Sequence, residues 1–221
     1  MTSITLYYHP LSSYCHKVLI ALAELGIDAE KHLLNLGDPV ERAAFLALWP
    51  TGKMPLLLDQ GRPVAETSII IEHLQLHHAA TGHTLIPHDS SAALQVRLWD
   101  RLMDQYVMTP MQKVVLDRMR PAGDHDGYGV AQARELLDKI YPWLDEHLAG
   151  RTWAAGEAFS LADCGAAPFL FYADWTHPID TAFANVRAYR QRLLARPSFA
   201  RAVDEARPYR PLFPLGAPDR D

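Results

Sequence analysis

The pattern of apolar and polar side chains at the start of the chain predicts a strand, a helix and a second strand. Alternate positions of residues 4–8 are apolar, which is typical of an extended segment. From Tyr14 to Leu25 the apolar residues recur at helical spacing, and Gly26 is placed to end that helix. A second strand is predicted at residues 29–34. A strand, a helix and a strand within about 35 residues are short enough to form a small parallel unit.

The next apolar runs predict a β-hairpin followed by a helix. Residues 55–59 and 62–65 have the character of strands, and Gln60–Gly61 between them has that of a turn. Residues 67–78 then carry apolar positions at helical spacing. Over residues 1–80 the predicted order is βαβ-ββα, which is the order of a thioredoxin-like domain.

Beyond a linker predicted at residues 81–89, nearly every apolar pattern is helical. We therefore expect residues 90–221 to form a helical bundle, so that the fold class is α/β plus all-α. A long helix is predicted from Ser90 or Ser91, and Pro110 is expected to kink or end it. That helix carries Leu94, Leu98, Leu102 and Tyr106. The remaining predictions are helices at 128–148, from about 160 and at about 183–207, and an irregular tail from Pro208.

Composition and charge narrow the classes of function. Of the 221 residues, 49% are hydrophobic and 21% are charged, as in an ordinary soluble protein. The net charge of −5, without a basic tract, argues against nucleic-acid binding. No apolar run reaches the roughly 20 residues of a membrane span, and the first residues lack the pattern of a signal peptide. Cys15 and Cys164 are too few and too distant for a disulfide framework, so we expect a cytoplasmic protein.

The segment Ser12-Ser13-Tyr14-Cys15 has the outline of a Cys-x-x-Cys redox motif whose first cysteine is a serine. It stands where the first strand meets the first helix, and a helix N-terminus favours negative charge. The Ser12 hydroxyl does not ionise, but it can donate a hydrogen bond to the thiolate of a ligand. The alternative is that both serines only cap the helix, a position that serine favours in any protein.

Two further stretches suit a peptide-like ligand. The Met54–Pro55 step before a strand is a candidate cis peptide, where the Met54 backbone could pair with an extended peptide; Pro55 could instead simply begin an edge strand. Thr67 is placed as the cap of a helix whose N–H groups suit a carboxylate, and Glu66 beside it suits an ammonium. Together they match the head group of an α-amino acid, although a capped surface helix would read the same way.

In this order and spacing, the motifs make nearly the whole chain similar to the soluble glutathione S-transferases. Ser12 stands in the position of the activating serine of the serine-type branch, and GKMP followed by ETS resembles the glutathione-binding signature. The chain departs from the family pattern in having Trp49–Pro50 where Asn-Pro is common, and a threonine at position 67 where serine is commoner. The glutathione-binding residues that the resemblance implies are Lys53, Met54, Pro55, Glu66 and Thr67.

The resemblance also implies a glutathione conjugation of a hydrophobic electrophile by a homodimer that needs no metal. We expect the His73–His78 face and the helix around Arg97–Arg101 to take part in the dimer contact. His73 and His77 have metal-ligand spacing, but no cysteine or carboxylate completes an obvious zinc set, so these histidines are interpreted as part of a solvated or interface face. The electrophile pocket is expected to include Leu11, Tyr106, Met108, Met111, Phe171 and Trp175.

Several alternatives stay open at this point. Ser13, Tyr7, Tyr8 or Cys15 could activate the thiol instead of Ser12. The protein could be a glutathione-dependent isomerase of the maleylacetoacetate type, whose acidic substrate would require arginines in the pocket. It could also be a regulatory protein that binds glutathione without catalysis. The segment Ser160–Asp163 resembles the family's folding motif and reads as a capping box, so Asp163 is assigned to stability and not to catalysis.

Overall fold

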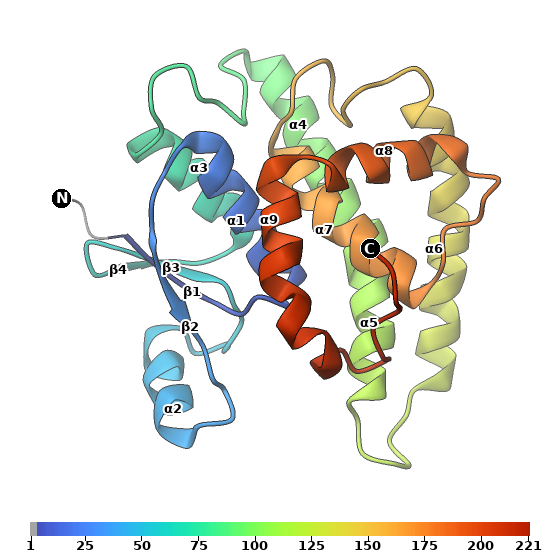
Figure 1. Ribbon diagram of the computed structural model, residues 1–221, viewed down its shortest axis with the longest axis horizontal. Helices are drawn as coiled ribbons and strands as arrows, with labels where there is room; N and C mark the ends of the chain where they lie inside the picture. The colour runs from blue at the N-terminus through green and yellow to red at the C-terminus, as the bar shows by residue number, and fades with distance from the viewer. Residues whose placement is uncertain (1–3) are drawn as a thin grey trace.

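The computed structural model describes residues 4–221, and its first domain is a four-stranded sheet with helices on both faces (Figure 1). The strands follow the order β2-β1-β3-β4. The pair β1–β2 is parallel, whereas β3 is antiparallel to both of its neighbours. This is the predicted thioredoxin-like arrangement. Its elements are β1 (Ile4–Tyr8), α1 (Ser13–Leu25), β2 (Glu30–Leu33), α2 (Pro39–Leu48), β3 (Leu56–Asp59), β4 (Arg62–Val64) and α3 (Thr67–His77).

The register of the strands decides which loops meet. Tyr7 lies opposite Leu56, and Leu57 lies opposite Val64. The chain that leaves β1, the chain that enters β3 and the start of α3 therefore gather at one end of the sheet, which we call the Ser12 end. At the other end, Ile4 lies opposite Asp59, the last residue of β3. We call this the Asp59 end.

Helices α1 and α3 cover one face of the sheet, and α2 covers the other (Figure 1). The α1–α3 face shares the main hydrophobic core of the molecule, with Leu6, Val18 and Ile71 fully buried. Helix α2 was not predicted. Its Asp38 cap and Pro39 are a legible helix start that the sequence analysis passed over, and Phe45 is the one buried side chain among its residues.

The C-terminal domain is helical, as expected, and is built around α7. Every residue of α7 is buried, because α1, α4, α5 and α8 pack around it. The predicted capping box begins this helix: the Asp163 carboxylate accepts hydrogen bonds from the Ser160 N–H and hydroxyl, each at 2.9 Å. The elements are α4 (Ser90–Met103), α5 (Thr109–Arg118), α6 (Gly127–Leu148), α7 (Leu161–Thr176), α8 (Ala184–Leu194) and α9 (Pro197–Ala206), with a π-helical turn at Asp104–Met108 and a 3₁₀ turn at Arg207–Leu212.

The helix predicted from residue 90 differs from expectation in two ways. Its break is the π-helical turn at Asp104–Met108, and Pro110 lies inside the first turn of the next helix, where its missing N–H is harmless. Leu94 and Leu98 point to solvent and are 63% and 46% exposed, because α4 buries the face that carries Trp99 instead. The sequence analysis identified the face of α4 that carries Leu94 and Leu98 as apolar. The structure buries a different face of this helix.

A buried polar contact joins the two domains. The Lys17 side chain of α1 is fully buried, and its Nζ lies 2.6 Å from Asp100 Oδ1 of α4. Ser68 of α3 accepts from Lys17 Nζ at 2.9 Å and donates to Asp100 Oδ2 at 2.6 Å. A buried charge is tolerated only when it is paired and hydrogen-bonded. These three side chains therefore fix the positions of α1, α3 and α4 relative to one another.

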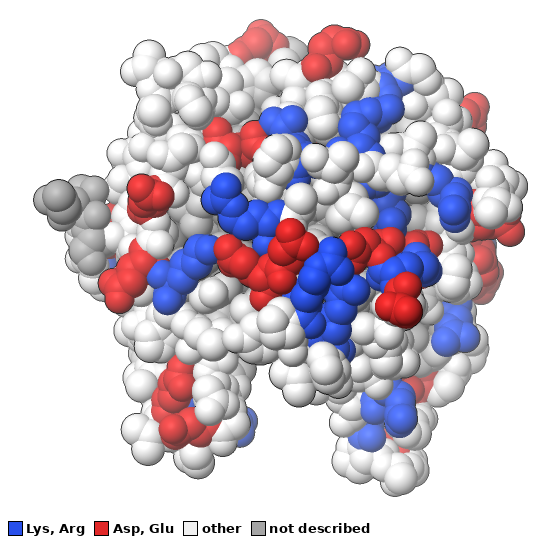
Figure 2. All heavy atoms as spheres, viewed as in Figure 1, with Lys and Arg blue, Asp and Glu red and all other residues white. Residues whose placement is uncertain are grey.

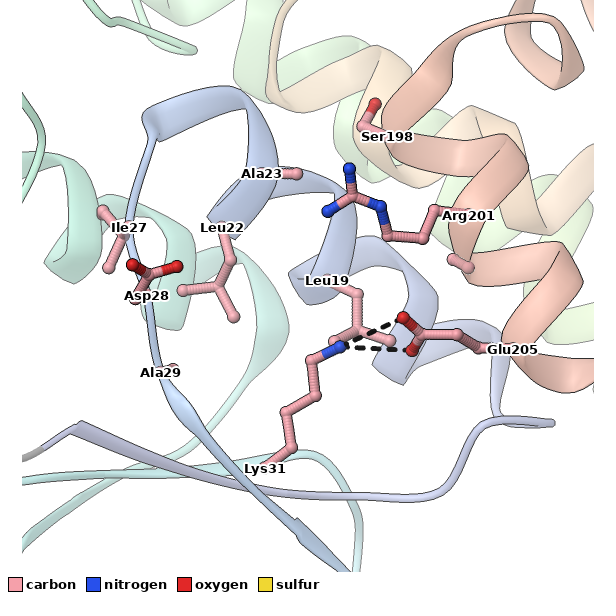
Figure 3. A pocket seen from close by; sticks show the side chains of 11 residues that line it. Leu19, Leu22, Ala23, Ile27, Asp28, Ala29, Lys31, Ser198, Arg201 and Glu205 are labelled. Carbon is pink, nitrogen blue, oxygen red and sulfur yellow. Dashed lines mark hydrogen bonds and ion pairs between the residues drawn. The ribbon is translucent and has the colours of Figure 1, made fainter.

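A second link between the domains lies on the surface. Lys31 of β2 reaches Glu205 of α9 at 3.1 Å across a small crevice of about 170 Å³ between the two domains (Figure 3). On the face seen in Figure 2, basic and acidic side chains stand beside one another across this region and the end of the chain. Examples are the contacts of Arg207 with Asp204 and Asp221. This face therefore presents no patch of one sign of the kind that binds nucleic acid.

Candidate functional site

Ser12 occupies the N-cap of α1, at the Ser12 end of the sheet. Its backbone is extended, its N–H donates to the His9 carbonyl at 3.0 Å, and its Oγ accepts from the Cys15 N–H at 3.4 Å. Because Oγ acts there as an acceptor, the hydroxyl proton remains available, and no acceptor for it is found within residues 4–221. A half-buried hydroxyl at the head of a 13-residue helix is thus free to donate to a ligand.

The neighbouring nucleophile candidates are occupied or buried. Ser13 is 7% exposed and donates its hydroxyl to Met108 Sδ at 3.4 Å. Cys15 is fully buried, and burial raises the pKa of its thiol to about 11, so it is not a thiolate at neutral pH. Burial also raises the pKa of Tyr8, with the nearby Glu205 adding to the effect. Tyr7 stacks on Phe45 under α2, on the opposite face of the sheet from α1.

Tyr14 of the Ser12-Ser13-Tyr14-Cys15 segment binds the π-helical turn to the start of α1. The Tyr14 hydroxyl donates to Asp104 Oδ1 at 2.7 Å, and Arg101 donates to the other oxygen at 2.8 Å. Burial, followed by the contact with Asp104, raises the pKa of Tyr14 well above its ordinary value, so Tyr14 remains a neutral donor. Met108, the last residue of this turn, accepts the hydrogen bond from Ser13, and π-helical turns are frequent at functional sites.

A cavity of about 400 Å³ opens beside Ser12. Of the expected electrophile-binding residues, Leu11, Met108 and Met111 line it. No lysine, arginine, aspartate or glutamate does, and burial lowers the pKa of the lining His9, so the wall carries no formal charge at neutral pH. Ser13, Tyr14 and Met54, which the sequence analysis singled out for other reasons, also line the cavity. Sequence reasoning missed the rest of the wall, which comprises Gln112, Val115, Leu116, Met119, Tyr172, Leu212, Phe213 and Pro214.

A sequence signal existed for some of these missed residues and not for others. Val115 and Met119 follow Met111 at helical intervals of four, so the methionines of the sequence analysis could have been extended along α5. Leu212 to Pro214 had no such signal, because they reach the cavity only where the chain folds back after α9.

The structure places the other expected pocket residues elsewhere. Tyr106 is 43% exposed and does not line the cavity. Phe171 and Trp175 are buried in the core beside Phe199 and Phe213, and their rings pack 4.7 Å apart. Aromatic residues in a fully buried helix serve packing first, which is why sequence alone could not separate them from a binding wall.

The expected peptide-binding groups also lie at the Ser12 end. The Met54–Pro55 bond is cis, and Met54 lines the cavity. Glu66 has φ of 69°, in a region that residues other than glycine rarely adopt, and its side chain is exposed. Glu66, and not Thr67, is the N-cap residue; Thr67 is the first residue of α3. Lys53 is exposed in the loop before β3.

These positions leave hydrogen-bonding groups unused. Within the described chain, no partner is found for the backbone N–H or C=O of Met54, and the Glu66 side chain makes no capping hydrogen bond. Unpaired groups of both kinds at one end of a sheet suit a ligand with amide, ammonium and carboxylate groups.

Comparison with known proteins assigns both halves of the chain. Residues 6–82 match the family model described as the glutathione S-transferase N-terminal domain, and residues 127–192 match that of the C-terminal domain. No helix of the described chain is long and apolar enough to cross a membrane.

Similar proteins carry more than one name. The chain is 30% identical over 210 residues to glutathione S-transferase 3 of Zea mays, covering 92% of this chain and 94% of that protein. It is 26% identical to a stringent starvation protein A homolog of Coxiella burnetii, covering 92% of each. A crystal structure of a glutathione S-transferase from Methylobacillus flagellatus with GSH bound superposes with a TM-score of 0.82 at 28% identity, covering 90% of this chain and 98% of that one. The chain therefore belongs to the glutathione S-transferase family.

Proposed function

We propose that the protein is a glutathione transferase in which Ser12 activates the glutathione thiol for attack on an uncharged, apolar electrophile. The observation that carries this proposal is the free hydroxyl proton of Ser12 at the head of α1, beside an apolar cavity. A similar glutathione S-transferase, that of Methylobacillus flagellatus, was solved with GSH bound, which supports glutathione as the ligand.

The other residues at the Ser12 end each bind a different part of glutathione. The γ-glutamyl ammonium pairs with the exposed Glu66 carboxylate, and the γ-glutamyl carboxylate accepts from the N–H groups at Thr67, where α3 begins. The cysteinyl unit pairs with the Met54 backbone as an added strand, just before Pro55. The glycyl carboxylate lies near Lys53. These contacts direct the sulfur to Ser12.

The energetics of thiol activation are within reach of this arrangement. A free thiol has a pKa near 8.5, and lowering it by about 2 units requires roughly 2.7 kcal/mol in favour of the thiolate. A hydrogen bond to a charged acceptor contributes about 1.5–3 kcal/mol. The positive end of α1 adds to the contribution of the Ser12 hydroxyl. No further base is required, because the thiol proton passes to solvent before the thiolate attacks.

The uncharged cavity wall supports the proposal of conjugation over that of isomerisation. An acidic substrate needs cations, but Arg97 is paired with Glu72, Arg101 is paired with Asp104, and no arginine of residues 4–221 lines the cavity. Methionine side chains adapt to irregular apolar ligands, which suits a broad class of uncharged electrophiles.

Two measurements test the proposal. Isothermal titration with glutathione and with its S-hexyl derivative should show binding of both, and tighter binding of the derivative, whose alkyl chain enters the cavity. An electrophile panel of aryl halides, enones, peroxides and maleylacetoacetate should show turnover of the apolar members. Binding without any turnover would favour a regulatory role, a possibility raised by the relative named as a stringent starvation protein A homolog. No glutathione binding at millimolar concentration would overturn the proposal.

The proposed assembly is a homodimer through α3 and α4. Ile69 and Leu76 on α3 are 55% and 75% exposed, and the exposed Leu94 and Leu98 follow on α4. The Arg97–Glu72 ion pair bridges the two helices beside them. Light scattering at micromolar concentration should give a single species of twice 24.8 kDa, and Leu94→Glu together with Leu98→Glu should give the monomer mass. A monomeric wild-type protein would contradict this assembly.

A further inference from the structure

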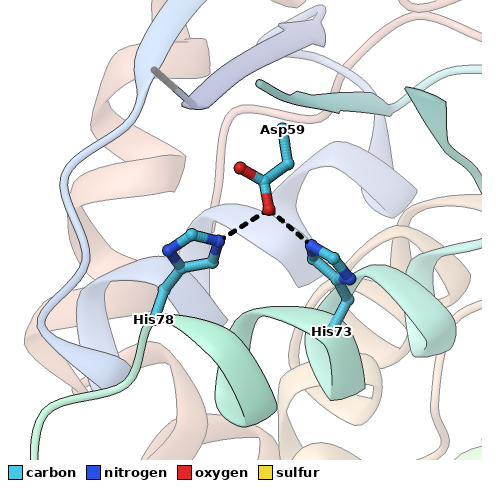
Figure 4. A group of neighbouring side chains, drawn as sticks. All are labelled: Asp59, His73 and His78. Carbon is cyan, nitrogen blue, oxygen red and sulfur yellow. Dashed lines mark hydrogen bonds and ion pairs between the residues drawn. The ribbon is translucent and has the colours of Figure 1, made fainter. Parts of the chain in front are cut away.

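Three side chains converge at the Asp59 end of the sheet, far from Ser12. Nε2 of His73 and Nε2 of His78 each lie close to the same oxygen, Asp59 Oδ2, at 2.7 Å and 2.8 Å (Figure 4). The three potential ligand atoms all lie within 4.8 Å of one another. The carboxylate comes from the last residue of β3, whereas both rings come from the end of α3.

The cluster is well sheltered. The side chains of Asp59 and His78 are 10% and 9% exposed, and that of His73 is 25% exposed. Burial by itself raises the pKa of Asp59, but the hydrogen bonds from the two rings outweigh it and hold that pKa below its ordinary value. Asp59 is therefore ionised at neutral pH and accepts both hydrogen bonds.

The polar groups of this cluster are not all satisfied by one another. Asp59 Oδ1 is buried, is turned away from the rings, and has no hydrogen-bond donor within residues 4–221 (Figure 4). A buried carboxylate oxygen without a donor is unfavourable, whereas a bound cation would neutralise the whole group. The terminal torsion of aspartate is soft, so either oxygen can turn toward an ion between the rings.

Two imidazoles and one carboxylate are a ligand set suited to zinc and neighbouring transition ions. In a tetrahedral site with bonds of about 2.0–2.1 Å, ligand atoms are separated by roughly 3.3 Å. The observed O···N separations of 2.7 Å and 2.8 Å therefore need to grow by about half an ångström, which side-chain torsions can supply. We propose that Asp59, His73 and His78 bind one divalent transition-metal ion, with Zn²⁺ as the reference ion.

The protons on Nε2 of His73 and His78 must be displaced before the ion can bind. In the hydrogen-bonded state both Nε2 atoms carry a proton, which must leave before Nε2 can coordinate. In a neutral ring the proton moves to Nδ1 through solvent exchange, and a cationic ring releases one proton to solvent.

Water or His77 can complete the coordination. The His77 ring lies 4.6 Å from that of His73, centroid to centroid, one helical turn along α3. Since the ion would tie the β3–β4 hairpin to the end of α3 and touch nothing at the Ser12 end, its role is structural. The site is thus independent of the proposed glutathione chemistry.

Titration of the metal-free full-length protein with Zn²⁺, and with Co²⁺ monitored by visible absorption, tests the site. We expect one ion per chain, a Co²⁺ spectrum typical of mixed nitrogen and oxygen ligands, and an upward shift of Tm with Zn²⁺. Asp59→Asn and His78→Gln should each weaken binding by roughly 100-fold, because each removes one of three protein ligands.

The matched control is His88→Gln, which removes an exposed histidine of the same chain outside the cluster and should leave binding unchanged. His77→Gln separates the two candidates for the fourth position. An unchanged affinity assigns that position to water, and a loss assigns it to His77; either result supports the three-residue site. Failure of the wild type to bind Zn²⁺ at about 100 μM, or binding by Asp59→Asn as tight as that of the wild type, would overturn it. Circular dichroism of each variant shows that it is folded.

Discussion

The two ends of the N-terminal sheet use polar residues in opposite ways. At the Ser12 end, the Ser12 hydroxyl proton and the Met54 backbone have no partner among the described residues, and an apolar cavity lies beside them. At the Asp59 end, one carboxylate and two imidazoles are turned on one another. Since buried polar groups are normally satisfied, groups left open at a cavity indicate a ligand with complementary groups. At the Asp59 end, the side chains already bind one another, so a cation would have to replace their hydrogen bonds.

The contact of Lys17 with Ser68 and Asp100 is what keeps the first of these ends in place, because it joins the helix behind Ser12 to α3 and to the second domain. Lys17→Met should therefore give the largest effect on stability, about 3–5 kcal/mol in the free energy of unfolding, by leaving Asp100 buried without its cation. Urea denaturation measures it.

The control for that prediction is Lys31→Met, which breaks the exposed ion pair with Glu205 and should cost less than about 1 kcal/mol. Adding Asp100→Leu to Lys17→Met should recover part of the loss, since the uncompensated charge is gone. Equal losses for Lys17→Met and Lys31→Met would show that the buried contact does not hold the domains together.

The second prediction addresses the open end directly. Glu66→Ala should raise the KM for glutathione by roughly 30-fold or more, because the ligand ammonium loses its counter-charge. Steady-state kinetics with glutathione varied at a saturating electrophile measure this change. Glu135→Ala, an exposed glutamate of α6 paired with Lys139, is the matched control and should leave KM unchanged. An unaltered KM for Glu66→Ala would remove Glu66 from the site.

The third prediction separates the two adjacent serines. Ser12→Ala should lower kcat/KM by roughly 10- to 100-fold near pH 7, because the pKa of the bound thiol rises by about 1–2 units. The deficit should shrink at high pH, where the thiol ionises without help, and the affinity for glutathione should stay nearly the same.

Ser13→Ala is the control for Ser12, since the Ser13 hydroxyl is already donated to Met108. It should change turnover by no more than about threefold. The assignment to Ser12 is wrong if Ser12→Ala is silent while Ser13→Ala or Tyr8→Phe abolishes turnover.

The smallest expected effect lies at the far end of α1. Burial raises the pKa of Glu24, but hydrogen bonds from Arg196 and Ser198 outweigh it, so the folded-state pKa lies below its ordinary value of 4.5. The unfolded chain therefore binds more protons between the two values, and the stabilisation by Glu24 is present above that window and lost as pH falls through the folded pKa.

For Glu24→Gln we expect Tm at pH 7 to fall by about 2–4 °C, as for a loss of roughly 1 kcal/mol in a chain of this size. The difference from the wild type should fade as the pH falls below 4.5 and through the lowered folded-state pKa of Glu24, where Glu24 of the wild type also becomes protonated. Calorimetric scans of both proteins from pH 7 to pH 3 measure it. A difference that does not depend on pH would mean that Glu24 acts through packing and not through its charge.

Local pattern was sufficient for much of this molecule. The alternation of residues 4–8, the Gly26 stop and the Ser160–Asp163 capping box each depend on neighbours within a few residues, so the thioredoxin-like domain and the helical second domain were predictable. The placement of Ser12 at the head of α1 follows from the same local rules. Helix α2 was missed although the Asp38 cap and Pro39 mark its start by the same local rules.

Tertiary structure decided everything that depends on distant segments meeting. Leu212 to Pro214 enter the cavity only because the chain turns back after α9, and Trp175 does not reach it because its ring packs against Phe171 and Phe213 in the core. The sequence analysis set aside a metal site at His73 and His77 because no carboxylate completed one. In the structure His73 and His78 meet the carboxylate of Asp59, which lies fourteen residues before His73 on a strand. Sequence spacing reports contacts within one helix or strand, whereas a site built from several elements is set by how those elements pack.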